Sequence, residues 1–199
     1  MTARATGLVR TLLVGIVLLA GCGISEDGAP QVIGEGELPP DLLSEPSTTT
    51  TLPPSQTVPV TIYLLRQSSE GPVLVPVERD VSDPGDAGQR IRAVLGAQPT
   101  PQEQARGLVS AIPPDVELLD APQNRETREL TIDLSGELFT IRGETLSSAF
   151  AQIVYTAAEL QGVRTVRFRI DGEPQQALDA AGAQQTAVDT SDYAAMAPE

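Results

Sequence analysis

The 199-residue chain contains no histidine, no lysine and no tryptophan, and it has one cysteine. Without histidine it lacks the commonest general base and the commonest metal ligand of proteins. A single cysteine excludes an internal disulfide, a CxxC redox pair and a zinc knuckle. Aromatic residues make up only 3% of the chain, so a hydrophobic core must be mainly aliphatic. No catalytic constellation and no metal site stand out, and we expect no cofactor.

Positive charge is also scarce. Acidic residues number 27 against 13 basic residues, all of them arginine, and the formal net charge is −14. A chain this acidic repels phosphate backbones, which disfavours binding through counterion release. We therefore expect no nucleic-acid partner.

The first 22 residues, MTARATGLVRTLLVGIVLLAGC, have the layout of a secretion signal. Arg4 and Arg10 give a positive start, and residues 11–21 form an uncharged apolar run. As a helix this run would measure about 16 Å, roughly half the thickness of a bilayer core, so it is no ordinary membrane span.

The residues Leu19, Ala20, Gly21 and Cys22 resemble the bacterial lipobox. In that motif the cysteine sulfur receives a diacylglyceryl group, and the signal is cleaved just before it. The resemblance implies a signal peptide over residues 1–21, lipid attachment at Cys22 and a place on the extracytoplasmic face of the membrane. The alternative is an ordinary signal with a coincidental cysteine.

Residues 22–57 differ sharply in composition from the remainder of the chain. The stretch after Cys22 carries six prolines and a run of four threonines, with no basic and no aromatic residue. Such a segment buries too little apolar surface to offset the entropy of ordering. It is therefore interpreted as a disordered tether.

Hydrophobic periodicity begins at Val58. Alternation predicts strands at residues 58–66, 71–81, 128–136 and 163–172 and a weak strand at 116–119, while helical spacing predicts helices at 86–98 and 144–162. Pro59 and Pro76 lack ladder donors, so we expect the first two strands to lie near sheet edges or to end early. Thr100, with Pro101 and Glu103, predicts a capped short helix.

These elements predict one α+β domain over residues 58–172, with a small mixed sheet of about five strands and two main helices on one face. Residues 173–199 form an acidic, alanine-rich C-terminal tail. We expect partial disorder there, although Tyr193 and Met196 could dock the tail onto the domain.

The order of these segments resembles the GerMN domain of sporulation and spore-germination proteins. The similar pieces are VTIYLL, LVPVERDV, AVLGAQPTPQEQARGLVSAIP, LTIDLSGEL, AQIVYTAAELQGVRTVRFRIDG and SDYAAM. The family often occurs in envelope lipoproteins, and its fold is similar to ring-building modules of sporulation machinery that bind proteins and are not known as enzymes. The chain departs from it at residues 96–100, where the family commonly has Gly-Pro-Thr directly, and it carries one copy where some relatives carry two.

Four charged residues form a candidate partner-facing surface. Glu129 and Asp133 point outward from their strand, as Arg167 and Arg169 do from the last strand. Ion pairs between the two strands account for these residues. The alternative is that the two carboxylates do the acid–base work of a glycan hydrolase.

Other polar groups have ordinary explanations. Asp80, Asp83 and Asp86 do not follow the frame of a calcium loop and suit a turn with helix-capping aspartates. Ser110 and Ser135 have no histidine or lysine to activate them.

The sequence thus predicts a non-catalytic, lipid-anchored extracytoplasmic protein whose domain contacts an envelope protein or peptidoglycan, in cell-wall or sporulation- and germination-related processes. The alternative is a cell-wall glycan hydrolase or an activator of one.

Overall fold

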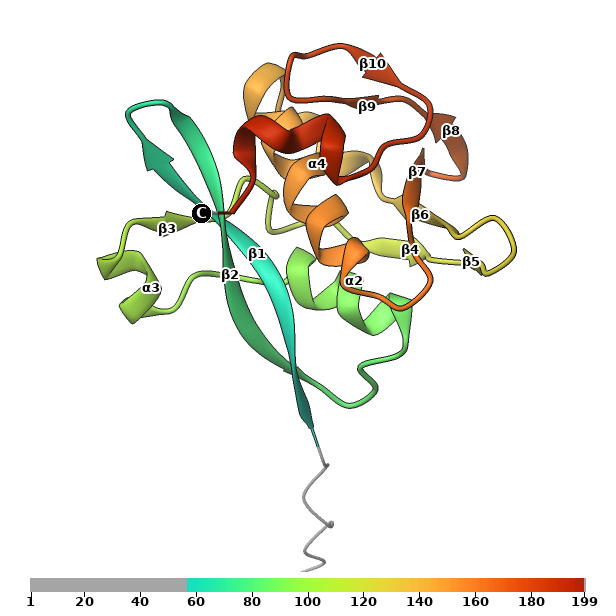
Figure 1. Ribbon diagram of the computed structural model, residues 1–199, viewed down its shortest axis with the longest axis horizontal. Coiled ribbons are helices and arrows are strands. Elements are labelled where there is room, and N and C mark those ends of the chain that lie inside the picture. Colours follow the sequence, from blue (N-terminus) through green and yellow to red (C-terminus); the bar gives the residue numbers. More distant parts are fainter. Residues whose placement is uncertain (1–56, 199) are drawn as a thin grey trace, which may run out of the picture. The chain divides into compact units, whose positions relative to one another are not determined.

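The computed structural model describes residues 57–198, in which three sheets and several helices share one hydrophobic core (Figure 1). The expected signal peptide, Cys22 and nearly all of the expected tether lie outside the described residues. In chain order the elements are β1 (Val58–Ser68), β2 (Gly71–Val81), α2 (Ala87–Leu95), α3 (Pro101–Ala105), β3 (Leu108–Val109), β4 (Leu118–Asp120), β5 (Gln123–Asn124), β6 (Glu129–Leu134), the 3₁₀ helix η3 (Gly136–Thr140), α4 (Gly143–Ala158), β7 (Thr165–Ile170), β8 (Glu173–Gln175), β9 (Ala177–Leu178), β10 (Gln184–Gln185) and the 3₁₀ helix η4 (Thr190–Met196).

The first sheet is a long hairpin with a short third strand. β1 and β2 pair antiparallel along their whole length, and β3 pairs with β1 only at Leu65 and Arg66, so the order is β2-β1-β3. Pro76 therefore lies on an edge strand, as predicted. Pro59 lies on the central strand, but beyond the reach of β3.

The second sheet has five strands and mixed pairing. Its order is β4-β6-β7-β8, with β5 also on β6; β6 and β7 run parallel, and the other pairs are antiparallel. Parallel neighbours need a crossover, and α4 supplies it. The predicted α+β class is confirmed.

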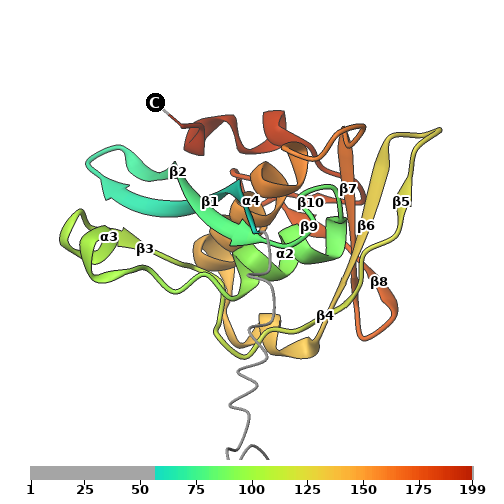
Figure 2. The same cartoon turned by 90° about the horizontal axis from the view of Figure 1, so that it is seen from below.

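The strands are divided between sheets, however, where the sequence predicted one sheet. The helices α4 and α2 lie between the β1–β2 hairpin and the β6–β7 sheet (Figure 2). Two fully buried side chains of α4, Gln152 and Thr156, form hydrogen bonds with the backbone of β1. Tyr63 N donates to Thr156 Oγ1 at 3.2 Å, and Gln152 Nε2 donates to Tyr63 O at 2.9 Å. Gln152 Oε1 also accepts from Ala111 N at 2.7 Å. These side chains thus satisfy the backbone N–H and C=O of Tyr63, which pair with no strand of the larger sheet.

The C-terminal segment belongs to the folded unit. Residues 173–198 form β8, β9, β10 and η4, and Val188 exchanges backbone hydrogen bonds with Val166 at 2.8 and 2.9 Å. Tyr193 is 0% exposed and Met196 is 4% exposed. Partial disorder is therefore wrong for these residues, and the docking of Tyr193 and Met196 is confirmed.

The predicted cap of the short helix is present and tied to the first sheet. Thr100 Oγ1 accepts from Glu103 N, and Glu103 Oε2 accepts from Thr100 N at 2.7 Å. Arg79 of β2 donates from Nη1 and Nη2 to the two carboxylate oxygens of Glu103 at 2.9 and 2.7 Å. The hydrogen bonds from Arg79, aided by those from Thr100, lower the pKa of Glu103 to about 2.

This pair predicts acid sensitivity. Because the folded pKa of Glu103 is below its unfolded value, the stabilisation is present above about pH 4.5 and is lost as the pH falls towards about 2. Glu103 is only 8% exposed, but the Arg79 side chain is 22% exposed and solvent partly screens the pair, so we expect a loss of about 1–2 kcal/mol over that window. Urea unfolding at several pH values measures it. Glu103→Gln should flatten this dependence and the exposed Glu126→Gln should not; equal slopes in both variants would contradict the assignment.

Candidate functional site

The four charged residues singled out from the sequence do come together, on the outer face of the second sheet. The parallel register places Asp133 opposite Arg169. Glu129 lies opposite Thr165, and Arg167 is two residues further along the same strand. The alternate positions on the two strands face the core and are buried: Leu130, Ile132, Leu134, Val166, Phe168 and Ile170.

Ion pairs link the two strands across this face. Arg167 Nε lies 2.6 Å from Glu129 Oε2, and Arg169 Nε lies 3.9 Å from Asp133 Oδ2. Asp133 Oδ1 also accepts from Gly172 N at 3.0 Å, while Arg169 donates to Gly172 O. The arginine side chains remain 45% and 48% exposed, against 26% and 12% for the carboxylates. The guanidinium groups are therefore what this face presents to solvent.

A hollow of about 570 Å³ lies beside the two arginines. Its lining comes from β6, β7, β8 and the residues around β10: Thr131, Arg167, Phe168, Arg169, Pro174, Gln175, Gln176 and Thr186. The lining includes guanidinium, amide and hydroxyl groups as well as apolar surface, so it offers hydrogen-bond donors and acceptors to a docked partner. The sequence missed the two glutamines and Thr186, because their segment was expected to be partly disordered.

The two serines considered from the sequence have structural roles. Ser110 Oγ accepts from Ile112 N at 3.2 Å, and Ser135 Oγ accepts from Glu117 N at 2.9 Å. Both hydroxyls thus bind backbone amides, and the Ser135 hydroxyl also hydrogen-bonds the exposed Glu137 carboxylate, which lowers the pKa of that carboxyl.

The acidic turn before α2 is a capping turn, as predicted. Asp86 is the N-cap of α2 and accepts from Gln89 N at 2.6 Å, and Asp83 accepts from Gly85 N at 3.0 Å. Within residues 57–198, no group of three or more acidic, histidine or cysteine side chains is arranged to hold a metal ion.

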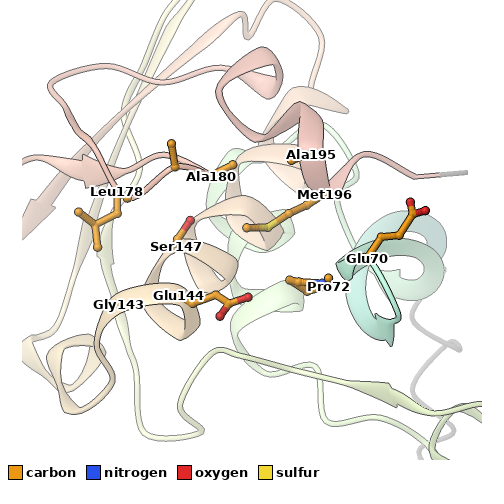
Figure 3. Close-up of a pocket in the computed structure, with 12 residues that line it drawn as sticks. Glu70, Pro72, Gly143, Glu144, Ser147, Leu178, Ala180, Ala195 and Met196 are labelled. Carbon is orange, nitrogen blue, oxygen red and sulfur yellow. The ribbon is translucent and has the colours of Figure 1, made fainter.

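A separate hollow of about 440 Å³ lies between the β1–β2 turn, the start of α4 and the C-terminal segment (Figure 3). Glu144 and Met196 point into it from different elements. Its one hydroxyl, Ser147 Oγ, already donates to Asp179 O at 2.6 Å. Small residues and carboxylates make up most of the rest, so this hollow brings no set of reactive groups together.

The burial of Arg90 was not predicted from the sequence. Arg90 lies on the inner face of α2 and is 8% exposed. The signal was available, because Ala87, Arg90, Ile91 and Val94 follow helical spacing and so share one face.

None of the helices in residues 57–198 has the length and apolar character needed to cross a bilayer. Cys22 lies outside these residues, so its lipid attachment stays a prediction.

Comparison with known proteins gives the family. The family model Germane, described as sporulation and spore germination, matches residues 61–176. A search of curated proteins finds no match.

Solved structures give weaker likenesses. The tandem GerMN domains of the sporulation protein GerM from Bacillus subtilis are 23% identical with a TM-score of 0.49, covering 59% of this chain and 40% of that one. The first GerMN domain of the same protein is 16% identical with a TM-score of 0.49, covering 68% of this chain and 99% of that one. A candidate lipoprotein from Clostridium perfringens is 14% identical with a TM-score of 0.40, covering 65% of this chain and 87% of that one. The chain thus spans less than half of the tandem structure. Since the family match extends over more than half of the sequence, this chain belongs to the Germane family of sporulation and spore germination.

Proposed function

We propose that this chain is a lipoprotein, attached through Cys22 to the extracytoplasmic face of the cell membrane, whose Germane domain makes non-catalytic contacts with an envelope protein or peptidoglycan. The observation that carries the contact proposal is the outer face of β6 and β7. On this face, Arg167 and Arg169 are about half exposed and more exposed than the carboxylates with which they pair. They lie beside a hollow of about 570 Å³ whose lining includes amide and hydroxyl groups. The anchoring proposal rests on the lipobox and the apolar run before it.

The arrangement favours docking over glycan hydrolysis. A glycosidase needs two carboxylates that face the scissile bond, one to protonate the leaving oxygen and one to attack or to activate water. Glu129 is bound by Arg167, and Asp133 is bound by Gly172 N and lies near Arg169. Both carboxylates are thus occupied by the protein itself, and the domain is proposed to work without a cofactor.

Site-specific crosslinking tests the contact surface. A photoreactive residue replacing Thr131, at the centre of this face, should capture a defined envelope protein or peptidoglycan fragment in intact cells. Adding Arg167→Glu and Arg169→Glu should reduce the yield by about tenfold, because a charge of the wrong sign at a docking face repels the partner. The matched control places the same photoreactive group at Gln102, an exposed residue of α3.

Equal capture from positions 131 and 102, or capture that survives both charge reversals, would contradict the proposed face. Release of fragments from peptidoglycan by the purified chain, abolished by Asp133→Asn, would establish the hydrolase instead.

A further inference from the structure

A hollow of about 550 Å³ is lined by residues from the start of α2, the end of α4 and the β5 region. The β1–β2 turn lies beside the other end of α4, whose first residues line the hollow of Figure 3. The hollow of about 550 Å³ shares no lining residue with the hollow beside Arg167 and Arg169. The polar side chains in its lining are Arg90, Gln123, Arg125, Glu159 and Gln161.

Arg90 is the unusual member of this lining. Its Nη1 and Nη2 donate to Thr61 O and Pro84 O, each at 3.3 Å, and its buried Nε has no acceptor. Among residues 57–198, no carboxylate comes within 4.0 Å of its guanidinium nitrogens. Removal from water lowers the pKa of Arg90, and the charge of Glu159 opposes this in part.

Other inward-facing charges of this domain are paired. Arg79, whose side chain is 22% exposed, binds both oxygens of Glu103. Arg90 is more deeply buried, and Glu159, the carboxylate whose charge acts on it, accepts instead from the Tyr63 hydroxyl through Oε1 at 2.7 Å. A buried guanidinium with no carboxylate in contact is destabilising, so Arg90 in the lining of an open hollow points to an anion that binds there.

The lining also selects the class of anion. A guanidinium matches the planar, two-oxygen edge of a carboxylate, and Arg125 adds a second, exposed guanidinium at the mouth. Glu159 and the overall charge of −14 disfavour a dianion such as phosphate. We propose that this hollow binds a carboxylate, with Arg90 on its buried side and Arg125 at its mouth. The ligand is either a small free carboxylate or the carboxyl terminus of a peptide chain. This site is independent of the anchor and of the docking face proposed above.

Amide chemical shifts test the proposal in the full chain, purified in a non-ionic detergent. The probes are N-acetylalanine, N-acetyl-trialanine, the carboxamide of each, and inorganic phosphate. Both acids should move the amide signals of Gly85 and Gly162, which line the hollow, and leave Gly182, which lines the hollow of Figure 3. The carboxamides should cause at least about tenfold weaker effects, since they lack the charge that the arginines bind. Tighter binding of the trialanine acid would identify a chain terminus as the ligand, and equal binding a free carboxylate.

Three variants assign the effect to residues. Arg90→Met should weaken binding by at least about tenfold and the exposed Arg125→Gln by about threefold, because both lose a charge-assisted hydrogen bond. Arg92→Gln, an exposed arginine on the same helix that lines a different hollow, should bind like the unchanged chain. If Arg90→Met does not fold, the binding of the acids to Arg125→Gln tests the proposal.

Several outcomes overturn the proposal. These are no shift with either acid, equal shifts with acid and carboxamide, phosphate binding as tightly as the acids, and unchanged binding in Arg125→Gln.

Discussion

A Cys22→Ser chain is expected to carry no lipid and to lose its stable hold on the membrane. The thioether to a diacylglyceryl group requires the cysteine sulfur, and serine offers only a hydroxyl. Each buried methylene of an acyl chain contributes about 0.8 kcal/mol, and two chains anchor stably where one binds only marginally. Removing the attachment point therefore removes nearly all of the membrane affinity of the mature chain, since its negative charge is not attracted to an anionic surface.

Mass spectrometry of the N-terminal peptide, together with membrane fractionation, measures this result. The unchanged chain should begin at a lipid-modified Cys22. Gly23→Ser, a neighbouring small-residue change, is the control and should keep the modification. A Cys22→Ser chain that stays in the membrane fraction with an intact, lipid-free mature terminus would show that something other than this cysteine anchors the protein.

The outward-facing residues of the docking face could be predicted because the pattern within each strand is local. Outward charges alternate with buried aliphatic residues in β6 and β7, and a period of two fixes which side chains share a face. The cap at Thr100 is similarly local, since its two hydrogen bonds join residues three positions apart. Patterns of this kind need no knowledge of the rest of the fold.

The division into two sheets could not be predicted, because it depends on contacts distant in sequence. Gln152 and Tyr63 are 89 residues apart, and a glutamine in a helix ordinarily faces solvent. Here it is fully buried and links β1 to the segment after β3 through Tyr63 O and Ala111 N. Helical spacing could place Gln152 on α4, but not the backbone groups that it satisfies.

The burial of the Arg90 guanidinium also could not be predicted from the sequence. Spacing places Arg90 on the apolar face of α2, yet spacing alone does not separate a side chain that reaches water from one whose guanidinium stays buried. The hollow around it takes residues from α2, α4 and the β5 region, which meet only in the folded chain. A candidate binding site of this kind becomes visible only with the fold.

The C-terminal segment contributes a large buried aromatic side chain to the core, so we expect it to matter for the stability of the fold. Tyr193 is among the largest fully buried side chains, and it lies in η4, the last helical segment before the chain ends. The segment carries its own cap, in which Asp189 accepts from Ser191 N at 2.7 Å and Asp192 accepts from Asp189 N at 2.7 Å. Ala180 N also donates to Asp192 O at 3.0 Å, which joins η4 to the loop after β9.

Tyr193→Ala is expected to lower the free energy of unfolding by about 3–5 kcal/mol, the usual range for a fully buried aromatic side chain. Tyr193→Phe is the matched control, because the buried hydroxyl of Tyr193 has no hydrogen-bond partner among residues 57–198 and its removal leaves the ring packing intact. That variant should be neutral or more stable by up to about 1 kcal/mol, since it relieves the cost of an unsatisfied buried group. Urea unfolding of the full chain measures both. A Tyr193→Ala chain as stable as its parent would mean that the last segment does not contribute to the core, whereas a loss of equal size in both variants would mean that the hydroxyl, and not the ring, holds the segment in place.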